Sequence, residues 1–162
     1  MSQSQSTFLI KQTLTSILLN GLFSAIAVKV VFWRMAMVPL LGNPGLIGDS
    51  ILQTVVATFM STLPPSLVTS KWVLTRLDLP TARTPTARIL IRAILTALAA
   101  GLASSIVLPI AMPKLLATSL SFRYILLLKC LYGVAIGLAA TPFAVAAVLR
   151  EPRRGERTEE LI

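Results

Sequence analysis

The sequence predicts an all-α membrane protein whose fold is a four-transmembrane-helix bundle. The first observation is composition: the 162-residue chain is 55% hydrophobic and 13% charged, whereas soluble domains carry about 25% charged residues. The second is a mean hydropathy of +0.81. The third is that Lys and Arg residues flank the apolar stretches, as they do in proteins that face an anionic cytoplasmic leaflet. The net charge of +9 is therefore assigned to membrane orientation and not to nucleic-acid binding.

Four windows are long and apolar enough to cross a bilayer. A span needs about 20 residues, because a helical residue rises about 1.5 Å and the hydrocarbon core is about 30 Å thick. The windows are Gln12–Trp33, Ser50–Ser70, Ala93–Met112 and Cys130–Leu149. Each predicts a helix, since backbone groups in lipid must be paired within the segment. Gly42-Asn43-Pro44-Gly45 predicts a turn, Pro113 predicts the end of the third helix, and short loops predict that consecutive helices pack side by side.

The distribution of Lys and Arg predicts that both termini are cytoplasmic. The side with the termini holds ten basic residues: Lys11, Lys71, Arg76, Arg83, Arg88, Arg92, Arg150, Arg153, Arg154 and Arg157. The other side holds five: Lys29, Arg34, Lys114, Arg123 and Lys129. By the positive-inside rule the richer side faces the cytoplasm. Because no clear targeting peptide is present, the expected location is the bacterial cytoplasmic (inner) membrane. The expected partners are the lipid bilayer and either further copies of the chain or the other subunits of a membrane complex.

The chain is expected to form one membrane domain over residues 1–162, built from an internal duplication. At a shift of 80 residues, five side chains are identical: Leu18, Gly21, Leu22, Ser24 and Ile26 fall on Leu98, Gly101, Leu102, Ser104 and Ile106. The predicted units are hairpins of about 12–76 and 88–150, followed by a cytosolic tail, 151–162. Both hairpins start on the same side, so they are parallel repeats related by an axis along the membrane normal. Chance alignment of two apolar helices is the alternative.

A second alternative concerns the first window. Ala25-Ile26-Ala27 fits the small-residue pattern of a signal-peptide cleavage site. Cleavage there would leave three spans. The duplication favours an uncleaved first helix, because it relates that helix to the third.

The residue counts argue against an enzyme, a cofactor and a metal site. The chain has no histidine and one cysteine, Cys130, so the commonest general base is absent and no disulfide or cysteine cluster can form within the chain. Of the six acidic residues, four lie in the last twelve positions. No acidic residue is expected within a span, which argues against proton-coupled transport.

Small residues recur at every fourth position in the third and fourth windows. They are Ala97, Gly101 and Ser105 in the third, and Gly133 and Gly137 in the fourth. Such faces let helix backbones approach closely in lipid. We expect them to pack the third span on the fourth, or one copy of the protein on another.

Prolines and polar residues within the spans are the remaining candidates for function. Pro64, Pro65 and Pro142 predict helix kinks, which are either static or hinges. Asn20, near the middle of the first span, is expected to bond another helix or to contact a solute. Lys29 and Lys129 either extend to the headgroups or form a positive mouth for anions, and Asp49 is their only candidate partner.

The predicted function is a structural, accessory or assembly role through helix–helix association in the bilayer. The alternative is a small permease or channel, possibly dimeric, for a neutral or anionic solute without proton coupling. On that alternative Asn20, Lys29 and Lys129 would line the pathway.

Overall fold

The chain folds into four long helices and two short strands. The computed structural model describes residues 3–77, 85–116 and 118–149. In chain order the elements are α1 (Gln3–Phe32), β1 (Met37–Pro39), α2 (Leu46–Leu77), α3 (Thr86–Leu115), β2 (Ser119–Ser121) and α4 (Phe122–Leu149). Each helix contains a stretch long and apolar enough to cross a membrane. The prediction of four such helices is confirmed, whereas the two strands were not predicted.

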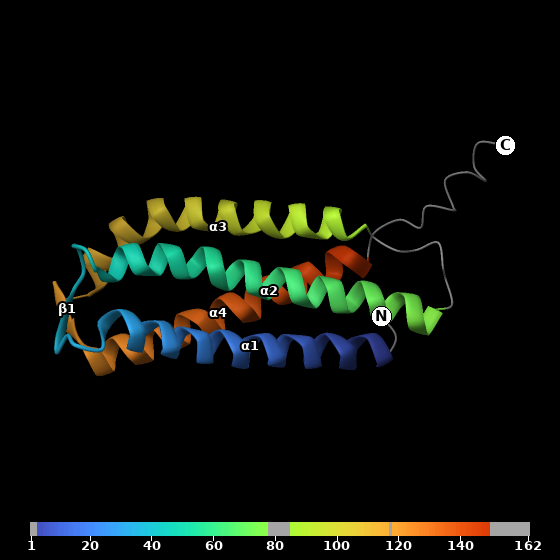
Figure 1. The fold of residues 1–162 in the computed structure, drawn as a ribbon, viewed down its shortest axis with the longest axis horizontal. Coiled ribbons are helices and arrows are strands. Elements are labelled where there is room, and N and C mark those ends of the chain that lie inside the picture. The colour runs from blue at the N-terminus through green and yellow to red at the C-terminus, as the bar shows by residue number, and fades with distance from the viewer. Residues whose placement is uncertain (1–2, 78–84, 117, 150–162) are drawn as a thin grey trace.

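The helices lie side by side in the order α1, α4, α2, α3 (Figure 1). The main interfaces join α1 to α4, α4 to α2, and α2 to α3. Helices α1 and α2 are consecutive in the chain but touch only slightly. The expectation that consecutive helices pack together therefore holds for α2 with α3 alone. Helices α2 and α4 form the middle of the bundle, and α1 and α3 flank them.

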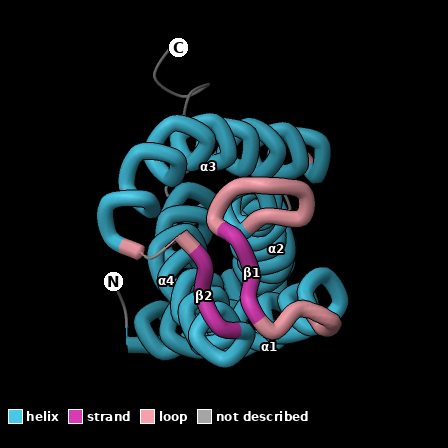
Figure 2. Tube along the Cα trace, turned by 90° about the vertical axis from the view of Figure 1, so that its left-hand side faces the viewer, coloured by secondary structure: helices cyan, strands magenta, loops and turns pink. Residues whose placement is uncertain are grey.

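The two strands close one end of the bundle, here called the strand end (Figure 2). They pair antiparallel, with Val38 opposite Leu120. Below them lies a core cluster of buried side chains: Val28, Phe32, Val38, Leu40, Leu46 and Ile125. The predicted turn at residues 42–45 is present, and Gly42 adopts a φ of +135°, which side chains with a Cβ rarely tolerate. This turn directs the chain back into α2.

Two helices begin earlier than the apolar windows predicted, and this changes where charges lie. Helix α2 begins at Leu46 and α4 at Phe122, so Asp49 and Lys129 are inside helices and inside the candidate spans. The expectation that no acidic residue lies within a span is therefore wrong. A hydropathy window stops at a charge, but a helix continues through one that is paired inside the bundle.

The expected end of the third helix at Pro113 is also wrong. Helix α3 runs on to Leu115. A proline removes one backbone hydrogen bond, here to the carbonyl of Pro109 four residues earlier, and one lost bond in the last turn does not stop the helix.

Polar side chains are buried and apolar side chains are exposed, the reverse of a soluble fold. Helix α2 carries nine of the buried polar residues: Ser50, Gln53, Thr54, Thr58, Ser61, Thr62, Ser66, Thr69 and Ser70. Large apolar side chains on the flanking helices are open, such as Leu18 at 72% and Leu102 at 67% exposed. In water such a surface would be costly, but in lipid it faces an apolar solvent.

Glycines allow two of the close helix contacts. A Cβ on Gly133 or Gly137 of α4 would meet α1, and a Cβ on Gly101 of α3 would meet Val55 of α2. Ala97 is also buried, whereas Ser105 is exposed. The expectation that these faces pack the third span on the fourth is wrong, because the fourth helix uses its glycines against the first.

Substitution of Gly133 by alanine should destabilise the α1–α4 interface. The added Cβ would meet the Ser24 hydroxyl and would lie 2.9 Å from the Asn20 carbonyl oxygen, so α1 must shift. We expect Gly133→Ala to lower the free energy of unfolding by about 1–3 kcal/mol, the usual effect of overpacking. Thermal unfolding in mild detergent measures it.

The matched control is Gly48→Ala in α2, where nothing lies within 4 Å of the new Cβ. This change should be neutral or stabilise by up to about 1 kcal/mol through helix propensity. Equal stabilities of the two variants would contradict the proposed role of Gly133.

Candidate functional site: a buried polar chain

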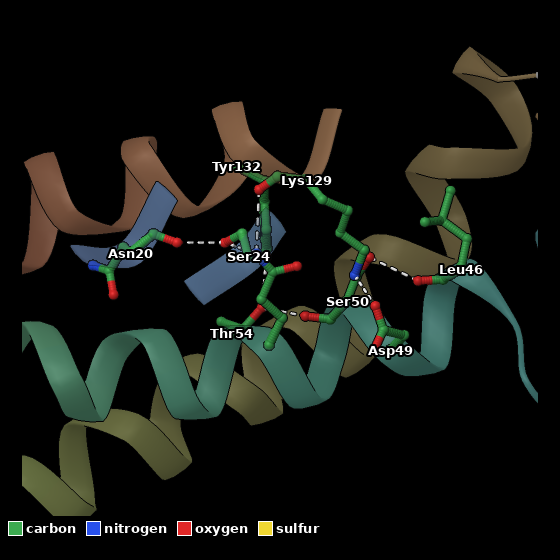
Figure 3. Close-up of polar contacts among 9 residues, drawn as sticks. Asn20, Ser24, Leu46, Asp49, Ser50, Thr54, Lys129 and Tyr132 are labelled. Atoms are coloured by element: carbon green, nitrogen blue, oxygen red, sulfur yellow. Dashed lines mark hydrogen bonds and ion pairs between the residues drawn. The ribbon is translucent and has the colours of Figure 1, made fainter. Parts of the chain in front are cut away.

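The candidate site begins at a buried ion pair near the strand end. Lys129 Nζ of α4 lies 2.6 Å from Asp49 Oδ2 of α2 (Figure 3). The Lys129 side chain is 1% exposed and that of Asp49 is 14% exposed. Asp49 occupies the first turn of α2, where the helix dipole stabilises a carboxylate. The pair therefore ties the two central helices together at this end.

A glutamine next to the ion pair connects three helices. Gln53 Nε2 of α2 donates to Ser24 Oγ of α1 at 2.6 Å and to the Lys129 carbonyl oxygen of α4 at 3.2 Å. Ser24 in turn donates to the Asn20 carbonyl oxygen at 2.7 Å, as Figure 3 shows. Gln53 thus links the ion pair to the polar face of α1.

The polar chain continues to Asn20. Asn20 Nδ2 donates to Ser61 Oγ of α2 at 2.5 Å. The Ser61 carbonyl oxygen accepts a bond of 3.2 Å from the Thr141 hydroxyl of α4. That carbonyl is available because Pro65, four residues later, has no N–H to donate to it. The proline of α2 thereby creates an acceptor that α4 uses.

A branch of the chain joins α2 to α4 by hydroxyl groups. The Thr54 hydroxyl lies 2.6 Å from the Tyr132 hydroxyl, and Thr54 also donates to the Ser50 carbonyl oxygen (Figure 3). Ser50 donates to the carbonyl oxygen of Leu46. These bonds pair polar groups that would otherwise be buried in an apolar medium at a cost of a few kcal/mol each.

The glycines of α4 make room for the polar residues of α1. A Cβ on Gly133 would collide with Ser24, and one on Gly137 would lie 2.9 Å from Asn20 Nδ2. The small-residue pattern and the polar chain are therefore one arrangement: Gly133 and Gly137 let Asn20 and Ser24 approach the central helices.

The predicted site residues do not all meet. Asn20 and Lys129 belong to the buried polar chain, whereas Lys29 is exposed at the surface of α1. Pro65 is buried, Pro64 is exposed and Pro142 is half-buried, and α2 and α4 continue through them. Lys29 and Lys129 therefore do not form one positive mouth.

Sequence reasoning missed several members of the chain. Gln53, Ser61 and Tyr132 were not singled out, although Gln53 is the one side-chain amide in the second apolar window. That amide was a usable signal, because a buried amide in a span needs partners on another helix. The direction in which Ser61 and Tyr132 point could not be read from the sequence.

The four long apolar helices indicate an integral membrane protein. Comparison with protein-family models, with curated proteins and with solved structures gives no match for this chain. Among the residues that the structure describes, no group of three His, Cys, Asp or Glu side chains could hold a metal ion. What the polar chain offers chemically is hydrogen-bond donors and acceptors and one paired ammonium group.

Removing one member of the ion pair should be far more damaging than removing both. Lys129→Met leaves the Asp49 carboxylate buried without its partner, and we expect a loss of about 3–5 kcal/mol in unfolding free energy. The double variant Lys129→Met with Asp49→Leu should recover most of that loss, because an apolar pair replaces a buried ionic one at little net cost.

The control is Lys29→Met, which changes an exposed lysine on α1 and should alter stability by less than about 0.5 kcal/mol. A denaturant titration of the four proteins in mild detergent gives the comparison. A single variant as stable as the double variant would show that the two charges do not support each other.

Proposed function

We propose that the protein is an accessory or assembly component that works by association of helices within the bilayer. The observation that carries the proposal is the position of α3. It is held mainly by α2, and only 17% of its most apolar window is buried, against 44% for α2. Its outward side presents Leu95, Leu98 and Leu102, each more than half exposed. Another membrane helix could pack on this side without disturbing the central pair.

The proposal includes a duplicated two-helix unit with both termini on the cytoplasmic side. Two contacts support the duplication: Gly21 of α1 faces Val134 of α4, and Gly101 of α3 faces Val55 of α2. These contacts exchange at shifts of 80 and 79 residues. Each strand also precedes the second helix of its unit. The bias of Lys and Arg supports placing the strand end outside the cytoplasm.

Association through α3 can be tested by cross-linking in the native membrane. Cys130 is the only cysteine, so Cys130→Ser gives a cysteine-free background. In that background Leu102→Cys on α3, coupled to a photoactivatable thiol reagent, should give a protein adduct of fixed mass. The matched Leu18→Cys on α1, 72% exposed before substitution, should give much less.

Native mass spectrometry of the unlabelled protein from the same membrane should show a complex of fixed stoichiometry. A monomer in that spectrum, with no adduct from either cysteine, would contradict the accessory role.

The buried polar chain favours one second candidate, permeation of a small neutral or anionic solute. The chain runs from the Lys129–Asp49 pair to the Ser61–Thr141 contact, and it lies between the helices and not on their lipid side. The sequence argument against proton coupling required spans free of acidic residues. Because Asp49 lies within a span, proton coupling stays open on this candidate.

The second candidate predicts flux that depends on Asn20. In liposomes, Asn20→Leu removes the amide that bonds Ser61, and flux of the transported solute should fall to near background. Leu18→Ala, on the exposed side of the same helix, should leave the rate unchanged. Equal rates for Asn20→Leu and the unmodified protein would remove the polar chain as the pathway.

A further inference from the structure

A groove opens between α3 and α4, with α2 as its floor. Its volume is about 620 Å³, within the range of pockets that bind small molecules. The floor carries Thr54, Thr58, Thr62 and Ser66, and alanines form most of the α4 wall. The hydroxyls of Thr54 and Thr62 are bonded to carbonyl oxygens of α2 itself. The groove is therefore largely apolar in what it offers a ligand.

The opposite side of the bundle shows how wide this groove is. There the seam between α1 and α2, over α4, is closed by the bond from Asn20 to Ser61. With the shifts of 80 and 79 residues given by the paired glycine contacts, the equivalent positions are Ala100 and Ala140, which both line the groove. The same shift of 80 relates the Ser24 bond to the Asn20 carbonyl and the Ser104 bond to the Ala100 carbonyl.

This comparison sets the size of the occupant. The groove corresponds to a seam that two polar side chains fill, so its width is that of side chains. A helix, about 10–12 Å across with its side chains, is too wide to enter it. A single unbranched hydrocarbon chain fits a slot lined by alanines.

Length and charge narrow the ligand further. The groove extends along α3 from Ile89 to Ser104, about 22 Å at 1.5 Å per residue, whereas one leaflet contributes about 15 Å of the hydrocarbon core. One lipid of a single leaflet therefore spans it. Arg92 lines the groove toward the N-terminal end of α3, and a guanidinium group favours a phosphate.

We propose that the groove binds one acyl chain of an anionic phospholipid, with Arg92 contacting its phosphate. The chain lies along Ala100 and Ala140 toward the middle of the bundle. The headgroup lies at the end of the bundle opposite the strands, which the orientation proposed above makes the cytoplasmic leaflet. This site is separate from the buried polar chain and from the outward side of α3.

Native mass spectrometry of the full-length protein can test this. The purified protein is exchanged into mild detergent with equal amounts of phosphatidylglycerol and phosphatidylcholine of the same acyl chains. We expect one retained phosphatidylglycerol per chain. Arg92→Gln should reduce its preference over phosphatidylcholine about fivefold, the factor for one arginine near an anionic surface. Arg88→Gln, on an exposed residue one turn earlier that does not line the groove, should leave the preference nearly unchanged.

A second pair of variants tests the acyl chain independently of charge. Ala140→Leu fills the groove and should abolish retention of both lipids, whereas Ala135→Leu, on the exposed side of the same helix, should not. Unchanged thermal unfolding of each variant shows that the bundle is intact.

Equal retention of the two lipids by the unmodified protein, or equal effects within either variant pair, would overturn the proposal. So would an Ala140→Leu variant that loses a second protein chain in place of a lipid, since the groove would then be a protein interface. None of these outcomes depends on the accessory role, which the cross-linking of α3 tests separately.

Discussion

The arrangement of the bundle depends on one constraint, the need of α2 to pair its polar side chains away from lipid. A polar group left unpaired in hydrocarbon costs several kcal/mol, so a helix with this many hydroxyls and an amide cannot lie at the periphery. It lies in the middle, where α4 supplies Lys129 and Thr141 and α1 supplies Asn20 and Ser24. The positions of α1 and α4 follow from these partners. Helix α3 brings little to this network and remains the most open helix.

Small residues and a proline make the polar contacts geometrically possible. Gly133 and Gly137 remove the side chains that would hold α1 away from α4, and Pro65 frees the carbonyl oxygen that Thr141 bonds. Features that are usually read separately, a glycine pattern and a helix proline, therefore serve the same buried chain. The α3 side lacks this chain: alanines stand where Asn20 and Ser61 meet on the α1 side, and a groove results.

The two proposals for function use different parts of the molecule. Association involves the outward side of α3, while permeation would involve the polar chain between α1, α2 and α4. The lipid groove lies between these regions and contacts α2 from the side opposite Asn20. Variants can therefore separate the three: Leu102 reports on α3, Asn20 on the interior and Ala140 on the groove. A structural protein and a permease would differ in which of these positions matters.

The sequence by itself determined the class of fold, because apolar length is a local property that each window carries alone. It also identified Asp49 as the only carboxylate available to Lys129, since the composition left no other. It did not determine where the helices begin, because hydropathy windows end at charges that the bundle in fact pairs. The helix order α1, α4, α2, α3, the role of Gln53 and the groove were decided only by the tertiary structure. These depend on how each helix is rotated about its axis, and that rotation is set by polar partners far apart in the chain.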